Sequence, residues 1–357
     1  MTLTQPTSHP RFDGTMLAMR MLHSKQPLEA MRIPIPPLKD GELLIRVKAC
    51  GVCRTDLHIL DGELTERHLP LVLGHEVVGE VVCVGTGSHS HSQSKSKSRS
   101  DPHTFSNGDR VGVPWLGHTC GRCSYCVNGE ENLCDRPEFT GYDRDGGYAE
   151  YIAADARYCF KIPDQYDDLH AAPLMCGGLI GYRAYSMLAD CERLGLYGFG
   201  AAAHIVAQIA VSQGKKVYAF TREDDIRTQK FALSLGATWA GGSNLKPPQQ
   251  LDAAIIFAPA GELVPQALAT TRKGATVICA GIHMSDIPRF PYSLLWGERS
   301  IHSVANLTRA DGEAFFKIAQ QIPLKISATR YALQDANLAL DDLRAGKLEG
   351  AAVLMPD

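Results

Sequence analysis

The stretch Gly198-Phe199-Gly200-Ala201-Ala202-Ala203 decides the fold of half of this chain. The short apolar segment Leu194 to Tyr197 precedes it, and a helical pattern over residues 204–213 follows and stops at Gly214. In this strand-to-helix context, a G-x-G-x-x-A turn lets the backbone approach a pyrophosphate, which the helix N-terminus then holds. We predict a dinucleotide site at Gly198, Phe199, Gly200, Ala201 and Ala203; a merely tight turn is the alternative.

The segments after this turn alternate between strand and helix patterns. Strands are predicted at residues 216–220, 251–257 and 275–280, with helical segments between them. This alternation is typical of a doubly wound parallel sheet that binds its ligand at the carboxyl ends of the strands. The second strand ends in Thr221 and Arg222, a hydroxyl and a cation that favour the 2′-phosphate of NADP over NAD, although Glu223 and Asp224 could reach a ribose hydroxyl instead.

Two sets of cysteines have the spacing of metal ligands. Cys53 follows an apolar strand pattern, and His75 and Cys176 offer an imidazole and a second thiolate later in the chain. Three such ligands leave one position of a tetrahedral zinc open, which is typical of a catalytic site. A separate run of four cysteines within fifteen residues can close a structural zinc cage: Cys120, Cys123, Cys126 and Cys134. The alternative, four reduced surface thiols, is disfavoured because exposed thiols are reactive.

Length and composition limit the kind of protein this is. A chain of 357 residues exceeds the roughly 250 to 300 residues of a single core, so two domains are predicted. The net charge of −3 argues against nucleic acid or an anionic membrane as partner. The chain has no long apolar stretch and no hydrophobic signal core at its polar start, so we expect a cytoplasmic protein. The Ser-, His- and Lys-rich segment 88–106 is predicted to be an exposed, disordered insertion rather than a metal site.

Several motifs together resemble one family. They are Gly74-His75-Glu76-Val77-Val78-Gly79 with Gly85 following, Cys53-x-Thr55-x-x-His58, the four-cysteine run, and Cys176 before the nucleotide turn. In this order they resemble the zinc-dependent alcohol dehydrogenases of the medium-chain dehydrogenase/reductase superfamily, over all of the chain except the insertion. The resemblance implies an α/β architecture: a mainly β GroES-like catalytic domain (1–172) with a structural zinc lobe, a Rossmann doubly wound parallel sheet domain (173–305), and a C-terminal return to the first domain (306–357).

The resemblance also implies roles for individual residues. Cys53, His75 and Cys176 would hold a catalytic zinc, with Glu76 as a transient ligand and Asp56 fixing the tautomer of His75. With the lobe, this makes two zinc ions per subunit.

The same resemblance assigns the proton path and the pocket. Thr55 would bond the substrate oxygen and pass its proton, by way of the nicotinamide ribose, to His58 at the solvent side, while Arg54 would reach the pyrophosphate. Trp115 and Leu116 would line the substrate pocket. Each of these residues has an alternative role. Thr55 could equally be a helix cap, and His58 could be a surface histidine. Trp115 and Leu116 could be core residues.

The predicted activity is reversible hydride transfer between a primary or secondary alcohol and NAD(P), in a homodimer or homotetramer. One alternative is a polyol or aromatic (cinnamyl-type) aldehyde reductase on the same scaffold. Outside enzymes, a zinc-lobe protein that binds nucleic acid or a partner chain is the alternative. The acidic charge balance and the lack of a basic stripe argue against that alternative.

Overall fold

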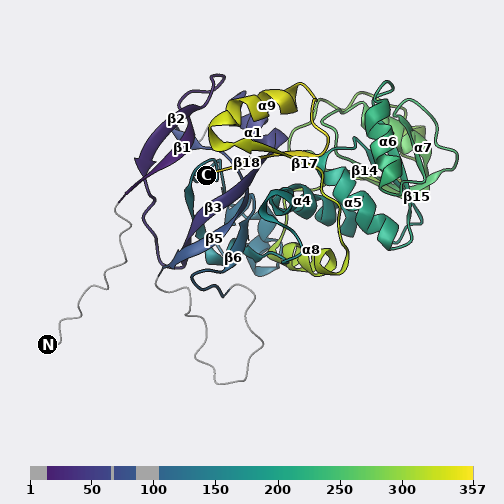
Figure 1. Cartoon of the computed structure of the whole chain (residues 1–357). Coiled ribbons are helices and arrows are strands. Elements are labelled where there is room, and N and C mark those ends of the chain that lie inside the picture. The colour runs from purple at the N-terminus through teal and green to yellow at the C-terminus, as the bar shows by residue number, and fades with distance from the viewer. Residues whose placement is uncertain (1–13, 66–67, 86–103, 357) are drawn as a thin grey trace.

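A computed structural model describes residues 14–65, 68–85 and 104–356 of the chain. A β-rich part and an α/β part lie side by side, and the C-terminal segment returns to the β-rich part (Figure 1). Most of the predicted insertion lies outside the described residues. Its end does not fit the prediction of an exposed loop, because Phe105 is only 2% exposed in the core of the β-rich part.

The β-rich part is built around β3 (Glu42–Val52), whose residues are almost all buried. It pairs with three other strands, all antiparallel: β5 (Glu76–Val84), β9 (Tyr151–Asp155) and β18 (Ala351–Met355). The same sheet continues through β6 (Arg110–Val113) and β10 (Phe160–Lys161) on one side and β17 (Ala328–Ala332) on the other. Two smaller sheets contain β2 (Glu29–Pro34), β1 (Thr15–Met21) and β4 (Leu71–Val72), and β7 (Leu116–His118) with β8 (Glu138–Phe139).

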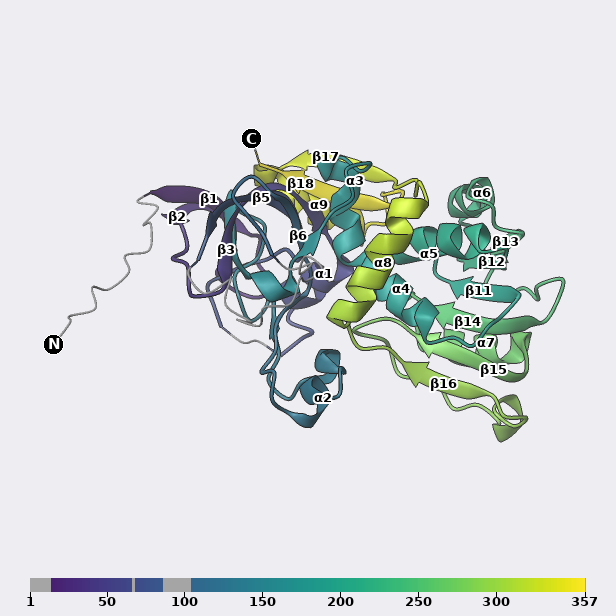
Figure 2. The same ribbon diagram turned by 90° about the horizontal axis from the view of Figure 1, so that it is seen from below.

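The α/β part has one sheet of six strands in the order β13-β12-β11-β14-β15-β16, all parallel. The order reverses between β11 and β14, the switch point where such sheets bind ligands at their carboxyl ends. This confirms the predicted doubly wound parallel sheet (Figure 2). Its strands are β11 (Arg193–Tyr197), β12 (Lys216–Thr221), β13 (Trp239–Gly242), β14 (Leu251–Ile256), β15 (Thr271–Cys279) and β16 (Ser300–Ser303).

Helices cover the sheet and join the two parts. Around the parallel sheet lie α5 (Ala201–Ser212), α6 (Ile226–Ser234) and α7 (Leu263–Thr270). The others are α1 (Arg54–Leu60), α2 (Ser124–Val127), α3 (Asp168–Ala171), α4 (Gly177–Ser186), α8 (Arg309–Gln321) and α9 (Ala336–Arg344), with short 3-10 turns at Glu131–Leu133, Ala156–Tyr158, Ala172–Met175, Tyr292–Leu294 and Leu333–Asp335. None of the helices in the described ranges is long and apolar enough to cross a membrane.

The run Gly146 to Ile152 has the pattern of a strand, but only its last two residues lie in one, because β9 begins at Tyr151. Before it, the chain folds tightly over the Gly74 turn, where a Cβ at Gly146 would lie 2.2 Å from the Gly74 carbonyl oxygen. Tyr148 is consequently carried, fully buried, toward the start of α1.

Candidate active site

Four potential metal ligands converge where β3 and β5 meet. Cys53 precedes α1 directly after β3, and Cys176 precedes α4. His75 lies just before β5, and Glu76 is its first residue. The strands are antiparallel with Gly51 opposite Glu76, so the end of one adjoins the start of the other. One donor atom from each of the four residues lies within 4.8 Å of the others, and the two sulfur atoms are 3.8 Å apart.

A buried carboxylate holds this cluster in place. Asp56 Oδ2 accepts hydrogen bonds from the Cys53 backbone N–H at 2.8 Å and from the Tyr148 hydroxyl at 3.0 Å. Its other oxygen lies 3.2 Å from Nδ1 of the fully buried His75. Within the described part of the chain, Nε2 of His75 has no hydrogen-bond partner. An orphaned buried imidazole nitrogen beside two thiols fits the ligand set of a zinc ion.

The electrostatics of the cluster point the same way. Burial alone would lower the pKa of His75, but the Asp56 carboxylate raises it well above its usual value. The hydrogen bond with Cys176 lowers the pKa of Cys53 well below that of a free thiol, helped by His75. Burial raises the pKa of Glu76 well above its normal range. A thiolate is therefore favoured beside groups that hold their protons, and a divalent cation would replace those protons.

The four cysteines of the second set also come together. One sulfur atom from each lies within the same 4.8 Å limit, and the backbone N–H groups of Cys120 and Cys123 point at the sulfurs of Cys134 and Cys120, at 3.3 and 3.4 Å. Backbone N–H groups lower the pKa of Cys120 to about 6. The lobe that carries them protrudes around α2 (Figure 2). Four sulfurs and no carboxylate or imidazole fit a closed structural zinc site.

The predicted relay residues lie on α1 beside the cluster. Thr55 is buried, with its hydroxyl 3.7 Å from Cys53 Sγ, and Arg54 at the start of the helix is exposed. The sequence analysis expects His58 at the solvent side. The structure differs, because the His58 side chain is only 11% exposed. Its Nδ1 bonds to Glu63, and its ring centroid lies 5.1 Å from that of His283.

The two predicted pocket residues differ in position. Trp115 and His75 pack in a T-shaped arrangement, with ring centroids 4.9 Å apart, and Trp115 stacks on Phe139 and Tyr142. It therefore forms part of an aromatic wall beside the cluster. Leu116 is almost fully buried in β7, which matches the alternative of a core residue.

The nucleotide turn lies where the sequence predicts it. Gly198 has a φ of +85°, and a Cβ there would lie 2.8 Å from the backbone nitrogen of Ala258. Gly200 precedes α5 and has open space where a side chain would be, whereas Phe199 and Ala203 are buried.

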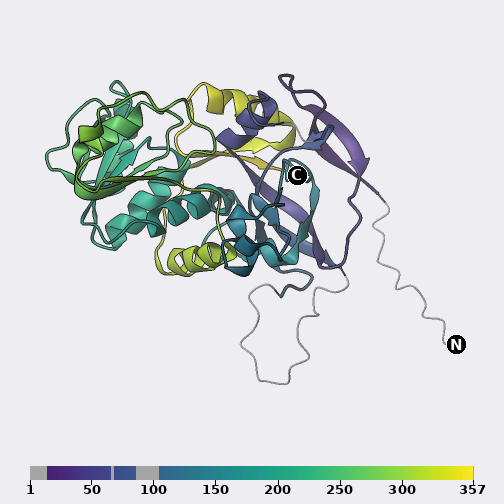
Figure 3. The same ribbon diagram turned by 180° about the vertical axis from the view of Figure 1, so that it is seen from behind.

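The cysteine cluster and the nucleotide turn are close to each other in space. A Cβ on Gly177, next to Cys176, would lie 3.3 Å from the backbone of Ala201. His283, which follows β15, packs on α1 from the carboxyl-end side of the parallel sheet. A bound dinucleotide and the cluster of metal-ligand candidates would thus face the same region between the two parts. Figure 3 shows these two parts side by side from behind.

At the end of β12, the two predicted cofactor residues differ in their surroundings: Thr221 is buried and Arg222 is exposed. The Thr221 hydroxyl donates to the Arg222 carbonyl at 2.8 Å and accepts from Gln229 at 3.0 Å, so it is engaged locally. The Glu223 carboxylate accepts from Asn244 at 3.1 Å. No described carboxylate pairs with the exposed guanidinium of Arg222.

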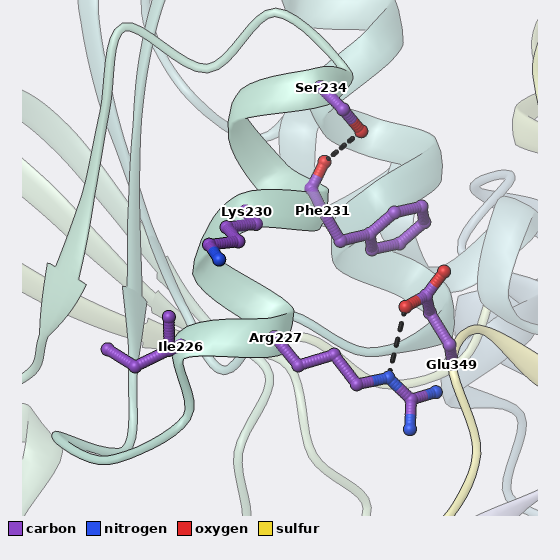
Figure 4. Close-up of a pocket in the computed structure, with 6 residues that line it drawn as sticks. All are labelled: Ile226, Arg227, Lys230, Phe231, Ser234 and Glu349. Atoms are coloured by element: carbon purple, nitrogen blue, oxygen red, sulfur yellow. Dashed lines mark hydrogen bonds and ion pairs between the residues drawn. The ribbon is translucent and has the colours of Figure 1, made fainter.

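A shallow groove lies elsewhere, along α6. Figure 4 shows its lining, in which Arg227 donates to Glu349 of the C-terminal segment at 3.1 Å. Lys230 and Phe231 complete its central part, and none of the cysteines or histidines of the clusters contributes. The groove is a surface feature between α6 and the returning chain, and it is distinct from the two cysteine clusters.

Sequence patterns did not reveal three residues at the centre. Tyr148 contacts Asp56, which lies 92 positions earlier in the chain, and His283 contacts His58, which lies 225 positions earlier. The sequence holds no periodic signal for contacts over such separations. Glu63 lies only five positions after His58, and a carboxylate just past the end of a short helix could have indicated it.

The arrangement defines a class: a two-domain, zinc-type dehydrogenase in which a thiolate and imidazole cluster faces a Rossmann sheet. The profile described as alcohol dehydrogenase GroES-like domain matches residues 39–164. A probable alcohol dehydrogenase, AdhA, of Mycobacterium tuberculosis is 46% identical over 332 residues, 92% of this chain and 93% of that protein. An alcohol dehydrogenase of Geobacillus stearothermophilus is 33% identical, over 92% of this chain and 96% of its own.

Solved structures agree with this fold. A cinnamyl alcohol dehydrogenase of Sorghum bicolor superposes with a TM-score of 0.83 at 23% identity, over 96% of this chain and 97% of its own. The chain belongs to the zinc-type alcohol dehydrogenases of the medium-chain dehydrogenase/reductase superfamily. It is an oxidoreductase that interconverts alcohols with aldehydes or ketones, and zinc and NAD(P) are the cofactors of this family.

Proposed function

We propose that Cys53, His75 and Cys176 hold the catalytic zinc and that Glu76 is its exchangeable fourth ligand. The observation that carries this proposal is the convergence of these four donors around an unpartnered His75 Nε2. Bound there, zinc would polarise the substrate oxygen and make the alcohol more acidic. Thr55 would orient that oxygen, Asp56 would fix the imidazole, and His58 would exchange the proton.

Metal analysis tests this assignment. The wild type should hold two zinc ions per chain, one in each cluster. Cys53→Ser or His75→Ala should retain the lobe zinc, lose the other ion and lose turnover. Wild-type turnover in either variant would reject the assignment.

The cofactor is proposed to be NADP rather than NAD. The Arg222 guanidinium is exposed at the end of β12, while the next acid in the chain, Glu223, accepts a hydrogen bond from Asn244. A free cation there favours a 2′-phosphate, as an arginine does at this position of the fold. Arg222→Ala should raise KM for NADP with little change for NAD; equal changes for both cofactors would contradict the preference.

The substrate is proposed to be a small alcohol or its aldehyde. A second candidate, an aromatic cinnamyl-type aldehyde, is favoured by the stack of Trp115, Phe139 and Tyr142 against His75. Flat rings offer stacking energy to an aromatic substrate. Comparison of kcat/KM for ethanol, benzyl alcohol and cinnamyl alcohol decides between the two, and Trp115→Ala should penalise only the aromatic substrates if the second candidate is correct.

We propose a homodimer formed through β16. This strand is an edge of the parallel sheet, and the segment before it exposes Tyr292 by 71% and Trp296 by 60%. An open edge beside apolar side chains is a surface that a second copy can cover. Light scattering should give a dimer for the wild type and a monomer for Trp296→Glu; an unchanged mass would reject this interface.

Eleven free cysteines support a reducing, cytoplasmic location.

A further inference from the structure

The end of α1 brings a carboxylate onto His58. Gly62 adopts a φ of +68°, and two backbone bonds close the helix end: Gly62 N–H to the Ile59 carbonyl at 3.1 Å and Glu63 N–H to the His58 carbonyl at 2.9 Å. This left-handed glycine cap turns the chain back along the helix. As a result, the Glu63 carboxylate reaches Nδ1 of His58.

The two side chains differ in their access to water. The His58 side chain is 11% exposed, whereas that of Glu63 is 43% exposed. On its other side, His58 packs against His283, with ring planes inclined by 53°. The imidazole is therefore enclosed, and Glu63 is the bonded neighbour that faces solvent.

The bond to Glu63 also fixes which nitrogen of His58 carries the proton. An ionised carboxylate can only accept a hydrogen bond, so Nδ1 must be the protonated nitrogen of the neutral ring. Nε2 is then the basic nitrogen of the neutral ring, the one that can accept a proton. Without the carboxylate, a neutral imidazole could adopt either tautomer.

We propose that Glu63 is a positioning residue that sets the tautomer of His58 and stabilises its protonated form. During alcohol oxidation, His58 Nε2 gains one proton, and the Glu63 carboxylate keeps its bond to Nδ1–H and balances the charge of the resulting imidazolium. The imidazolium then releases the Nε2 proton to water, which leaves the ring in its starting Nδ1–H tautomer. One proton leaves, and the reverse sequence supplies one for aldehyde reduction. This inference rests on the proposed role of His58.

A neighbouring acid provides a matched control. Asp61, two positions before Glu63, pairs with Arg344 at 2.5 Å and is not hydrogen-bonded to His58 in the described structure. Asp61, with Glu63 contributing, raises the pKa of Arg344, so both acids share one local field. Asp61→Asn therefore removes the same charge from the same surface but leaves the Glu63–His58 bond intact.

The first test reads the tautomer directly, in zinc-loaded protein without nucleotide. Nitrogen-15 NMR of the histidine rings, with His58→Gln to assign the signal, should show the Nδ1–H form in the wild type and in Asp61→Asn. Glu63→Gln should show a substantial Nε2–H population. An unchanged tautomer in Glu63→Gln, or the same change in Asp61→Asn, would overturn the proposal.

The second test is kinetic. In Glu63→Gln we expect kcat for alcohol oxidation to fall about 10-fold, with KM for the alcohol nearly unchanged. This is less than the loss of about 100-fold or more expected for the proton-transfer group itself, because Glu63 acts through His58. Glu63→Asp or added formate should restore part of the rate. If His58→Gln has wild-type kcat, the proposed relay itself fails; if only Glu63→Gln has wild-type kcat, this inference alone fails.

Discussion

Replacing Asp56 with asparagine is the sharpest test of how the catalytic cluster is held. The two side chains have nearly the same shape, and Asp56 is fully buried. Its Oδ2 already accepts from Cys53 and Tyr148, while Oδ1 faces only Nδ1 of His75. The amide oxygen of Asn will keep the first two bonds, because the reverse orientation would oppose two donors with an NH2 group.

This orientation places the amide NH2 group against His75 Nδ1. A donor there disfavours the Nδ1–H tautomer, and the alternative Nε2–H tautomer cannot bind a metal through Nε2. Loss of such an outer partner costs 10- to 100-fold in metal affinity, about 1.4 to 2.7 kcal/mol. Two charge-assisted bonds also become neutral ones, which lowers the free energy of unfolding by about 1 to 3 kcal/mol.

Competition with a colorimetric chelator measures the affinity of each zinc site, and the lobe zinc is the internal reference. Tyr148→Phe is the matched control, because it removes one bond to Oδ2 but leaves the charge and His75 untouched. It should lose about 1 kcal/mol of stability and keep its zinc. Wild-type affinity at the catalytic site of Asp56→Asn would refute the proposed role of Asp56.

Three further predictions concern single positions. Cys123→Ser should reduce the zinc content to one ion per chain and lower the melting temperature, because a structural zinc contributes folding energy; two retained ions would contradict the lobe assignment. Gly51→Ala should reduce kcat/KM at least 10-fold, because its Cβ would lie 1.8 Å from Glu76 Oε2; a wild-type rate would mean that the position of Glu76 does not matter. Burial lowers the pKa of His204 to about 4, so its unfolded form binds more protons below pH 6.5. Stability should therefore fall by about 2 kcal/mol from this residue between pH 7.5 and 5, a loss that His204→Phe should remove in urea titrations at the two pH values.

The sequence by itself determined those features whose geometry is local. The four lobe cysteines lie within fifteen residues, so their spacing already brings the sulfurs together. The G-x-G-x-x-A turn follows a strand and begins a helix, so its neighbours define its conformation. The alternation of strands and helices predicts the parallel sheet, but not β13 and β16, which have four residues each and lack an apolar alternation.

Only the tertiary structure decided which side chains meet at the proposed catalytic centre. The register of β3 on β5, which places Gly51 opposite Glu76, joins Cys53 to His75, and the packing of α4 on α5 adds Cys176 beside the nucleotide turn. Tyr148 lies in the segment before β9 and His283 in the segment after β15, and no repeat in the sequence aligns either segment with α1. The physical reason is that sequence periodicity records which face of an element is buried. The partner across that face depends on how separate elements pack.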